Sequence, residues 1–196
     1  MFIETTHEDA AEGPLAQWYG SQRASWGFLP DYARCFATRP EVAQAWTTLN
    51  LAIREGMDRR RFEIATIAAA RARRSTYCTV AHASFLRDVC GDEEGVRALA
   101  EAPDGSTLGA QDAAVVAFAT KLAVDAASVE QHDVDALRAA GLSDADVADV
   151  VLAVAARAFF TTVLDGLGAR LDAATAATFE PDVLAAMVVG RPVGDH

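Results

Sequence analysis

The stretch RRRFEIATIAAARARRSTYCTVAHASFLRDV, residues 59–89, decides the fold class of this chain. Residues 59–72 are apolar on nearly every side of a helix, a pattern typical of a helix buried inside a protein. Two arginines end this segment, where cations suit the negative end of a helix dipole. Ser75 follows as a helix-capping residue type and predicts a second helix over roughly 76–89. The stretch therefore predicts two consecutive, largely buried helices.

The chain on both sides of this stretch continues the helical pattern. Pro40 suits the first position of a helix that Gly56 ends, and Ser143 caps a longer helix with one apolar face. No run alternates between apolar and polar residues as a strand does. We therefore expect an all-α helical bundle built from helical hairpins, with an acidic N-terminal arm over 1–13 and a single domain over 14–196.

The charge balance limits the possible partners. The sequence has 17 lysines and arginines against 28 aspartates and glutamates, a formal net charge of −11. A negative surface repels phosphate backbones and anionic lipid, so we expect neither a nucleic acid nor a membrane as partner. The best apolar stretch, residues 147–156, contains Asp149 and is far shorter than the roughly 20 residues of a membrane span. Residues 1–13 lack the apolar core of a signal peptide.

The cysteines indicate a reducing compartment. Cys35, Cys78 and Cys90 are odd in number and have no disulfide-framework spacing. Free thiols are the rule where glutathione and thioredoxin keep cysteines reduced, so we expect a cytoplasmic protein.

Three residues of the opening stretch can carry chemistry together. Cys78 is the third residue after the capping serine, so the helix dipole should favour its thiolate and lower its pKa. His82 lies four residues further on the same face and can accept the thiol proton. Glu63 lies within the apolar helix, where burial should raise its pKa towards the range useful for proton transfer.

Each of these residues also has a purely structural explanation. A lone cysteine is usually a small core residue, a lone histidine is often satisfied by a structural hydrogen bond, and Glu63 can pair with a nearby arginine. Their combination at the start of one helix is what predicts a catalytic site at Cys78, His82 and Glu63.

The spacing of these residues resembles a known motif. Glu63 is followed by eleven residues, then Ser75, Tyr77, Cys78 and His82. This resembles the alkylhydroperoxidase D-like / carboxymuconolactone decarboxylase-like superfamily, specifically its peroxidase-related branch, where glutamate precedes Cys-x-x-Cys-x-x-x-His. Ser75 stands in the place of the first cysteine, and Tyr77 stands where an aromatic residue or histidine is common.

The resemblance covers roughly residues 13–172 and implies a fold and an activity. The implied fold is the all-α bundle of the alkylhydroperoxidase D-like type, assembled as a homo-oligomer (dimer, trimer or hexamer). The implied activity is thiol-dependent reduction of a small-molecule peroxide. In that scheme Cys78 attacks the peroxide, Glu63 and His82 form the proton relay, and Ser75 and Tyr77 are supporting residues.

The serine in the motif changes the expected cycle. Serine cannot form a disulfide, so Ser75 cannot close the two-cysteine cycle with Cys78. Cys90 would lie about 18 Å from Cys78 along one continuous helix, beyond disulfide reach. Nothing in the sequence positions Cys35 for this role. We therefore predict a one-cysteine cycle in which an external thiol reduces the sulfenic acid of Cys78.

Two alternatives remain open at this stage. The first is a carboxymuconolactone decarboxylase-like enzyme, in which His82 performs acid–base chemistry on a small lactone acid and Cys78 matters less. The second is a non-catalytic oligomeric redox sensor or binding protein, which the missing first cysteine favours.

No cofactor or metal is predicted. Cys78 and His82 provide only two ligands, and the other histidines, His7, His132 and His196, have no placed partners. No glycine-rich nucleotide loop follows a strand.

Overall fold

The computed structural model describes residues 1–195, and His196 lies outside the described residues. The α-helices are α1 (Gly13–Trp26), α2 (Pro40–Glu55), α3 (Arg59–Ala72), α4 (Thr76–Asp88), α5 (Glu93–Glu101), α6 (Ala110–Val124), α7 (Gln131–Ala139), α8 (Asp144–Leu167), α9 (Ala173–Ala176) and α10 (Pro181–Met187). Short 3-10 turns lie at η1 (Glu8–Ala10), η2 (Asp31–Phe36) and η3 (Ala126–Ser128). Residues 1–195 contain no strand, which confirms the all-α prediction.

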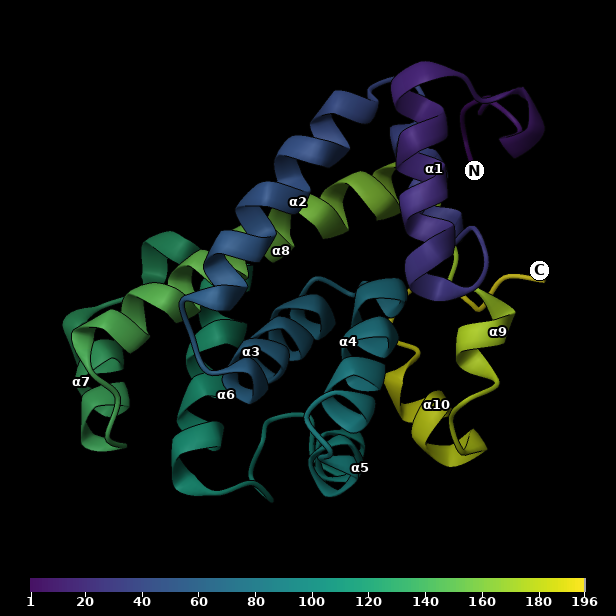
Figure 1. Ribbon diagram of the computed structural model, residues 1–196. Coiled ribbons are helices and arrows are strands. Elements are labelled where there is room, and N and C mark those ends of the chain that lie inside the picture. Colours follow the sequence, from purple (N-terminus) through teal and green to yellow (C-terminus); the bar gives the residue numbers. More distant parts are fainter. Residues whose placement is uncertain (196) are drawn as a thin grey trace.

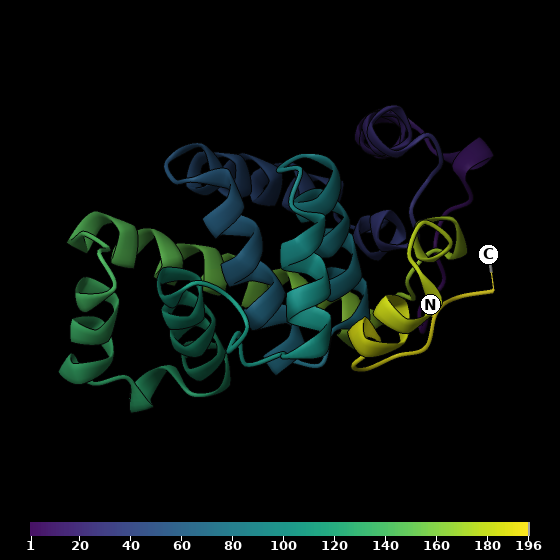
Figure 2. The same cartoon turned by 90° about the horizontal axis from the view of Figure 1, so that it is seen from below.

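Helix α3 is the centre of the bundle. It packs against α4, α6 and α8, and every residue from Phe62 to Ala70 is buried. The small alanine side chains of this segment allow its neighbours to approach closely, which explains how one helix can be covered on all sides. Figures 1 and 2 show α3 and α4 in the middle of the molecule, with α6 and α7 on one side and α9 and α10 on the other. The predicted buried helix at 59–72 is therefore confirmed.

The turn between α3 and α4 is held by the C-terminal segment. Arg74 has a left-handed backbone with φ of 57°, and Ser75 occupies the N-cap position of α4. The Gly190 amide donates a hydrogen bond to Thr76 Oγ1 at 2.9 Å. A side chain at residue 190 would place its Cβ 1.8 Å from the Arg74 carbonyl oxygen, so only glycine fits there.

Ser75 does not cap α4 in the way that the sequence suggests. It has the predicted N-cap position, but its side chain accepts no hydrogen bond from the first turn of the helix. Its buried hydroxyl oxygen has no hydrogen-bond partner within the described chain. The hydroxyl is directed toward Cys78 and Asp165 instead of toward the first turn of the helix.

Helix α8 is long and apolar enough to cross a membrane by length and composition alone. Half of its most apolar 18-residue window is buried inside the protein, as in the core helix of a globular fold. Its buried face packs on α2, α3 and α6. Figure 1 shows α2 and α8 crossing at one edge of the molecule.

The outer face of α8 carries an exposed stripe of apolar and small residues. Leu152 is 48% exposed and Phe159 is 42% exposed. The exposed stripe consists of Ala148, Leu152, Ala155, Phe159, Thr162 and Gly166. The spacing alternates between four and three residues, which is the spacing of a helix–helix seam in a coiled coil. We propose that, if the chain forms the predicted homo-oligomer, the copies meet at this face.

We predict that replacing Leu152 and Phe159 together by glutamate reduces the molar mass measured by light scattering after gel filtration. The introduced charges would have to be desolvated between two copies of α8, which opposes association. Val89→Glu is the control, because Val89 is 58% exposed but lies outside the stripe. An unchanged mass in the double variant would show that the copies associate elsewhere or not at all.

Candidate functional site

A cavity of about 230 Å³ opens between α1, α2, α3, α4 and α8. Its aromatic lining residues are Trp18, Trp26, Tyr32, Trp46, Phe62, Tyr77, Phe85 and Phe160. Glu63, Cys78 and His82 line the same cavity. The fold thus brings the three predicted catalytic residues, and Tyr77 with them, to one place.

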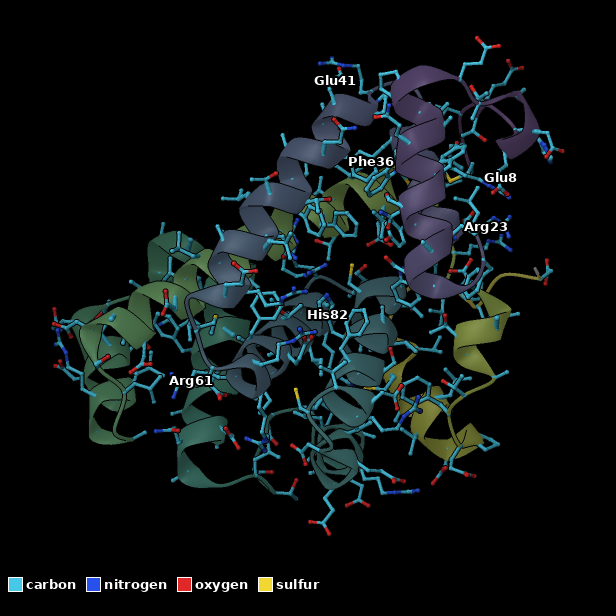
Figure 3. The ribbon with its side chains drawn as sticks, viewed as in Figure 1. Glu8, Arg23, Phe36, Glu41, Arg61 and His82 are labelled. Atoms are coloured by element: carbon cyan, nitrogen blue, oxygen red, sulfur yellow. The ribbon has the colours of Figure 1, made fainter. Side chains whose placement is uncertain are left out.

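Glu63 and His82 join α3 to α4 inside the protein. His82 Nδ1 lies 2.5 Å from Glu63 Oε2, and both side chains are buried. Arg59, one turn before Glu63, donates from Nε to Glu63 Oε1 at 2.5 Å. Both oxygens of the carboxylate therefore have a partner. Figure 3 shows His82 in the interior between α3 and α4.

These partners reverse the pKa shift that we expected for Glu63. Burial alone raises the pKa of the Glu63 carboxyl, but the charge and hydrogen bonds of His82 and Arg59 outweigh burial. The pKa is held below its ordinary value. The expectation of a raised pKa is therefore wrong, and Glu63 is an ionised anchor for His82.

His82 is neutral at pH 7. Burial, followed by the charge of Arg157, lowers its pKa from 6.5 to about 4, although Glu63 acts in the opposite direction. A neutral imidazole that faces a carboxylate with Nδ1 carries its proton on that nitrogen and a lone pair on Nε2. His82 can therefore accept a proton at Nε2.

Cys78 lies in the first turn of α4 as predicted, but its environment is not the one that we expected. The side chain is only 1% exposed. Burial raises the pKa of the Cys78 thiol, and the effect of Arg157 in lowering it is smaller. The expectation of a lowered pKa is wrong because desolvation outweighs the favourable position at a helix start.

The sulfur of Cys78 contacts an arginine instead of His82. Arg157 Nη1 lies 3.5 Å from Cys78 Sγ, whereas no hydrogen bond joins Cys78 to His82 within residues 1–195. Arg157 comes from the middle of α8 and is 2% exposed. Its guanidinium lies 5.4 Å from the Phe160 ring centroid and 5.9 Å from that of Trp46.

Arg157 is the site residue that the sequence reasoning missed. The sequence of α8 contains a signal for it. The buried positions Val147, Val150 and Val154 follow helical spacing, and Arg157 occupies the next position on that face. An arginine on the apolar face of a helix needs a structural or chemical reason, as Glu63 does in α3.

The supporting residues lie at the start of α4. The Ser75 hydroxyl faces Cys78 and Asp165 but forms no hydrogen bond of ordinary geometry with either. The Tyr77 hydroxyl donates to the Asp172 carboxylate, and burial raises the pKa of that phenol. Tyr77 therefore ties the start of α4 to the segment that precedes α9.

The other two cysteines do not take part. Cys35 is buried in η2, Cys90 is partly exposed just after α4, and all three cysteines are free thiols. Neither Cys35 nor Cys90 lines the cavity. Within the described part of the chain, no group of three or more histidine, cysteine, aspartate or glutamate side chains is arranged to hold a metal ion.

The fold is that of the alkylhydroperoxidase D-like proteins. An uncharacterised peroxidase-related protein from Ralstonia eutropha JMP134, described as an alkylhydroperoxidase AhpD core, has a TM-score of 0.77 at 20% identity, covering 97% of each chain. Another such protein, from Silicibacter sp. TM1040, has a TM-score of 0.73 at 20% identity, with 87% of this chain and 93% of that chain covered.

Residues 40–105 match the model of the carboxymuconolactone decarboxylase family. The debrominase Bmp8, as a cysteine-to-alanine variant in complex with 2,3,4-tribromopyrrole, is also similar, with a TM-score of 0.75 at 17% identity and 91% and 95% coverage of the two chains. No curated protein sequence matches this chain. At such identities the structural likenesses establish the fold.

We predict that the stability of the protein falls as the pH drops from about 6.5 towards 4, and that His82→Gln weakens this dependence. In that interval the unfolded chain binds a proton on His82 and the folded chain does not, so acid favours unfolding. The full effect is on the order of 3 kcal/mol. The lowered pKa of Glu63 adds loss of stability in the same direction at still lower pH.

Urea unfolding of both proteins at pH 7 and pH 5 measures this difference. His132→Gln is the matched control, because the His132 side chain is 70% exposed. If His82→Gln and the wild type lose the same free energy of unfolding between the two pH values, His82 is not neutral in the fold.

Proposed function

We propose that this protein reduces organic hydroperoxides with Cys78 as its redox-active thiol. The observation that carries the proposal is the convergence of Cys78, a neutral His82 and its Glu63 anchor on one cavity. The superfamily and the likeness to peroxidase-related proteins support the same reaction class.

The first half of the reaction transfers one oxygen atom to sulfur. His82 Nε2 accepts the thiol proton, and the thiolate attacks the terminal oxygen of the hydroperoxide. The sulfur–oxygen bond forms while the oxygen–oxygen bond breaks, and the alkoxide that leaves takes the proton back from His82. The products are an alcohol and the sulfenic acid of Cys78. Glu63 is a positioning residue, because it acts on the reacting atoms only through His82.

The second half of the reaction needs an external thiol. One thiol condenses with the sulfenic acid to give a mixed disulfide and water, and a second thiol releases Cys78 and a small disulfide. Ser75 cannot replace the external thiol, since a hydroxyl does not form a disulfide. The three free thiols of the chain fit a reducing compartment such as the cytoplasm, where such reductants are abundant.

The cavity favours an organic hydroperoxide over hydrogen peroxide. Trp46 stacks on Phe160 with ring centroids 4.0 Å apart, and Tyr32 meets Phe160 edge-on at 5.5 Å. Such walls stabilise a substrate by removing its apolar surface from water. Hydrogen peroxide has no apolar surface to bury there, so it gains nothing from them.

A second candidate is removal of a halogen from an aromatic ring. The observation in its favour is that an aromatic-lined cavity lies beside a thiol in the same fold as the debrominase solved with 2,3,4-tribromopyrrole. Two equivalents of a small thiol would supply the two electrons, giving the debrominated ring, bromide and a disulfide. Bromide release from 2,3,4-tribromopyrrole in the presence of dithiothreitol tests this candidate directly.

The two other hypotheses are separated by the reactivity of Cys78. A decarboxylase-like acid–base enzyme that depends on His82 would keep its activity after alkylation of Cys78, whereas a peroxidase would lose it. A non-catalytic sensor or binding protein would be oxidised no faster than an ordinary free thiol.

We predict that Cys78→Ser reduces turnover of cumene hydroperoxide to the uncatalysed background. His82→Ala should slow sulfenic acid formation about a hundredfold, because the thiol then loses its proton acceptor. Glu63→Gln should cause a smaller loss, because it only weakens the anchor of His82. Intact mass with a sulfenic acid trap follows the oxidation, and Cys90→Ser is the control. Full turnover by Cys78→Ser would refute the proposal.

We predict that Ser75→Cys allows Cys78 to form an internal disulfide after one peroxide is consumed. The two residues lie three positions apart, with Ser75 facing the Cys78 side chain at the start of α4. The expected product is a loss of two hydrogen atoms and no trapped sulfenic acid, read by mass spectrometry. Persistence of a trappable sulfenic acid at Cys78 in this variant would contradict the assigned motif position of Ser75.

A further inference from the structure

Arg157 carries a buried charge that no carboxylate balances. Its side chain is 2% exposed, its Nε has no hydrogen-bond partner, and no carboxylate lies within ion-pair distance of it in residues 1–195. Its one polar side-chain contact there is the 3.5 Å approach of Nη1 to Cys78 Sγ. The faces of Trp46 and Phe160 stabilise the cation only partly. An unpaired buried cation is costly, so this site is built to receive negative charge.

The neighbouring charged groups neither balance the charge of Arg157 nor stabilise an anion at the sulfur. Arg59 already pairs with Glu63, and Glu63 also holds His82. His82 is neutral at pH 7 and offers a lone pair, not a positive charge, to the cavity. Asp165 affects Cys78 from the same helix as Arg157, and its negative charge disfavours the thiolate. Arg157 is therefore the group facing the sulfur that can stabilise an anion.

We propose that Arg157 is a catalytic residue, which holds the Cys78 thiolate and then the oxygen that leaves when the peroxide bond breaks. The part that concerns the leaving oxygen rests on the proposed function. The part that concerns the thiolate does not, because it applies to any reaction in which Cys78 is the nucleophile.

The charge moves in one direction during this step. One negative charge passes from sulfur, through the transition state, to the oxygen that leaves as alkoxide, which His82 then protonates. Arg157 neither gains nor loses a proton. Its planar guanidinium has five N–H donors and can contact the sulfur and the leaving oxygen together. His82 thus moves the proton, while Arg157 stabilises the charge beside a buried sulfur.

The first test measures the thiolate without any peroxide. The rate of Cys78 alkylation by iodoacetamide is followed from pH 6 to pH 10 by peptide mass mapping. Arg157→Met should raise the apparent pKa of Cys78 and slow alkylation at pH 7 about tenfold or more, and Arg157→Lys should recover part of the rate. Besides Arg157, the titratable groups that act on Cys78 are Tyr32 and Asp165, and His82 lines the same cavity. The Ser75 hydroxyl also faces the sulfur, and all four residues remain in these variants.

Arg73→Met is the matched control for packing on α8. Arg73 donates to Thr161 Oγ1 at 2.9 Å and does not line the cavity. This variant should leave the alkylation profile of Cys78 unchanged. An unchanged profile in Arg157→Met would overturn the proposal.

A test on the wild-type protein remains decisive if Arg157→Met does not fold. Iodoacetate and iodoacetamide differ in charge but attack through the same carbon. The quantity compared is the rate of alkylation by iodoacetate divided by the rate of alkylation by iodoacetamide. A cation beside the sulfur should make this ratio higher at Cys78 than at Cys90, which lies near the acidic Glu63, Asp58 and Asp92. A ratio at Cys78 no higher than that at Cys90 would overturn the proposal.

The last test isolates the leaving oxygen. An alkyl hydroperoxide expels a strongly basic alkoxide, whereas a peroxycarboxylic acid expels a weakly basic carboxylate. Loss of Arg157 should slow oxidation of Cys78 more for cumene hydroperoxide than for peracetic acid. An equal loss for both would overturn the leaving-oxygen part. If wild-type Cys78 reacts with neither oxidant, the proposed function fails, but the alkylation tests still decide whether Arg157 holds the thiolate.

Discussion

The hydrogen bond between Glu63 and His82 is the constraint on which the site depends. It joins two helices through groups that would each be costly to bury alone, so α3 and α4 can be packed together only in the register that pairs them. Arg59, on the same helix as Glu63, forms an ion pair with the other oxygen of the carboxylate. The pair also fixes which nitrogen of His82 faces the cavity. One interaction therefore both joins α3 to α4 and orients the proton acceptor.

The site separates functions that are often assigned to one residue. In the proposed reaction, Glu63 orients His82, His82 accepts a proton, Cys78 is the nucleophile, and Arg157 balances charge. The first three come from adjacent helices, whereas Arg157 reaches Cys78 from 79 residues further along the chain. Because the thiol is buried and its pKa is raised, the resting protein holds it protonated. Reactivity then depends on a substrate that fills the cavity and on groups that act at the moment of attack.

Sequence reasoning succeeded where the information is local. The helices predicted at 59–72 and 76–89 are observed as Arg59–Ala72 and Thr76–Asp88, because periodicity and terminal residues are local properties. The spacing from Glu63 to His82 also placed both residues correctly on facing helices. The pKa shifts of Glu63 and Cys78 were predicted with the wrong sign, since burial and neighbouring charges come from the packing of α2, α3, α4 and α8 together. Arg157 was missed although its place on the apolar face of α8 can be read from the sequence, because the sulfur that it contacts is identified only by the folded chain.

The crossing of Gly190 over the turn between α3 and α4 links the C-terminus to the thiol. This glycine packs directly against the Arg74 carbonyl oxygen. Its amide donates a hydrogen bond to the hydroxyl of Thr76, which lies two residues before Cys78. Detachment of the last few residues, by a protease or by a bulky fusion tag, would loosen the turn from which α4 begins while leaving the helices themselves intact. The reactivity of the Cys78 thiol would then report on the state of the C-terminal tail before any probe of helical content did.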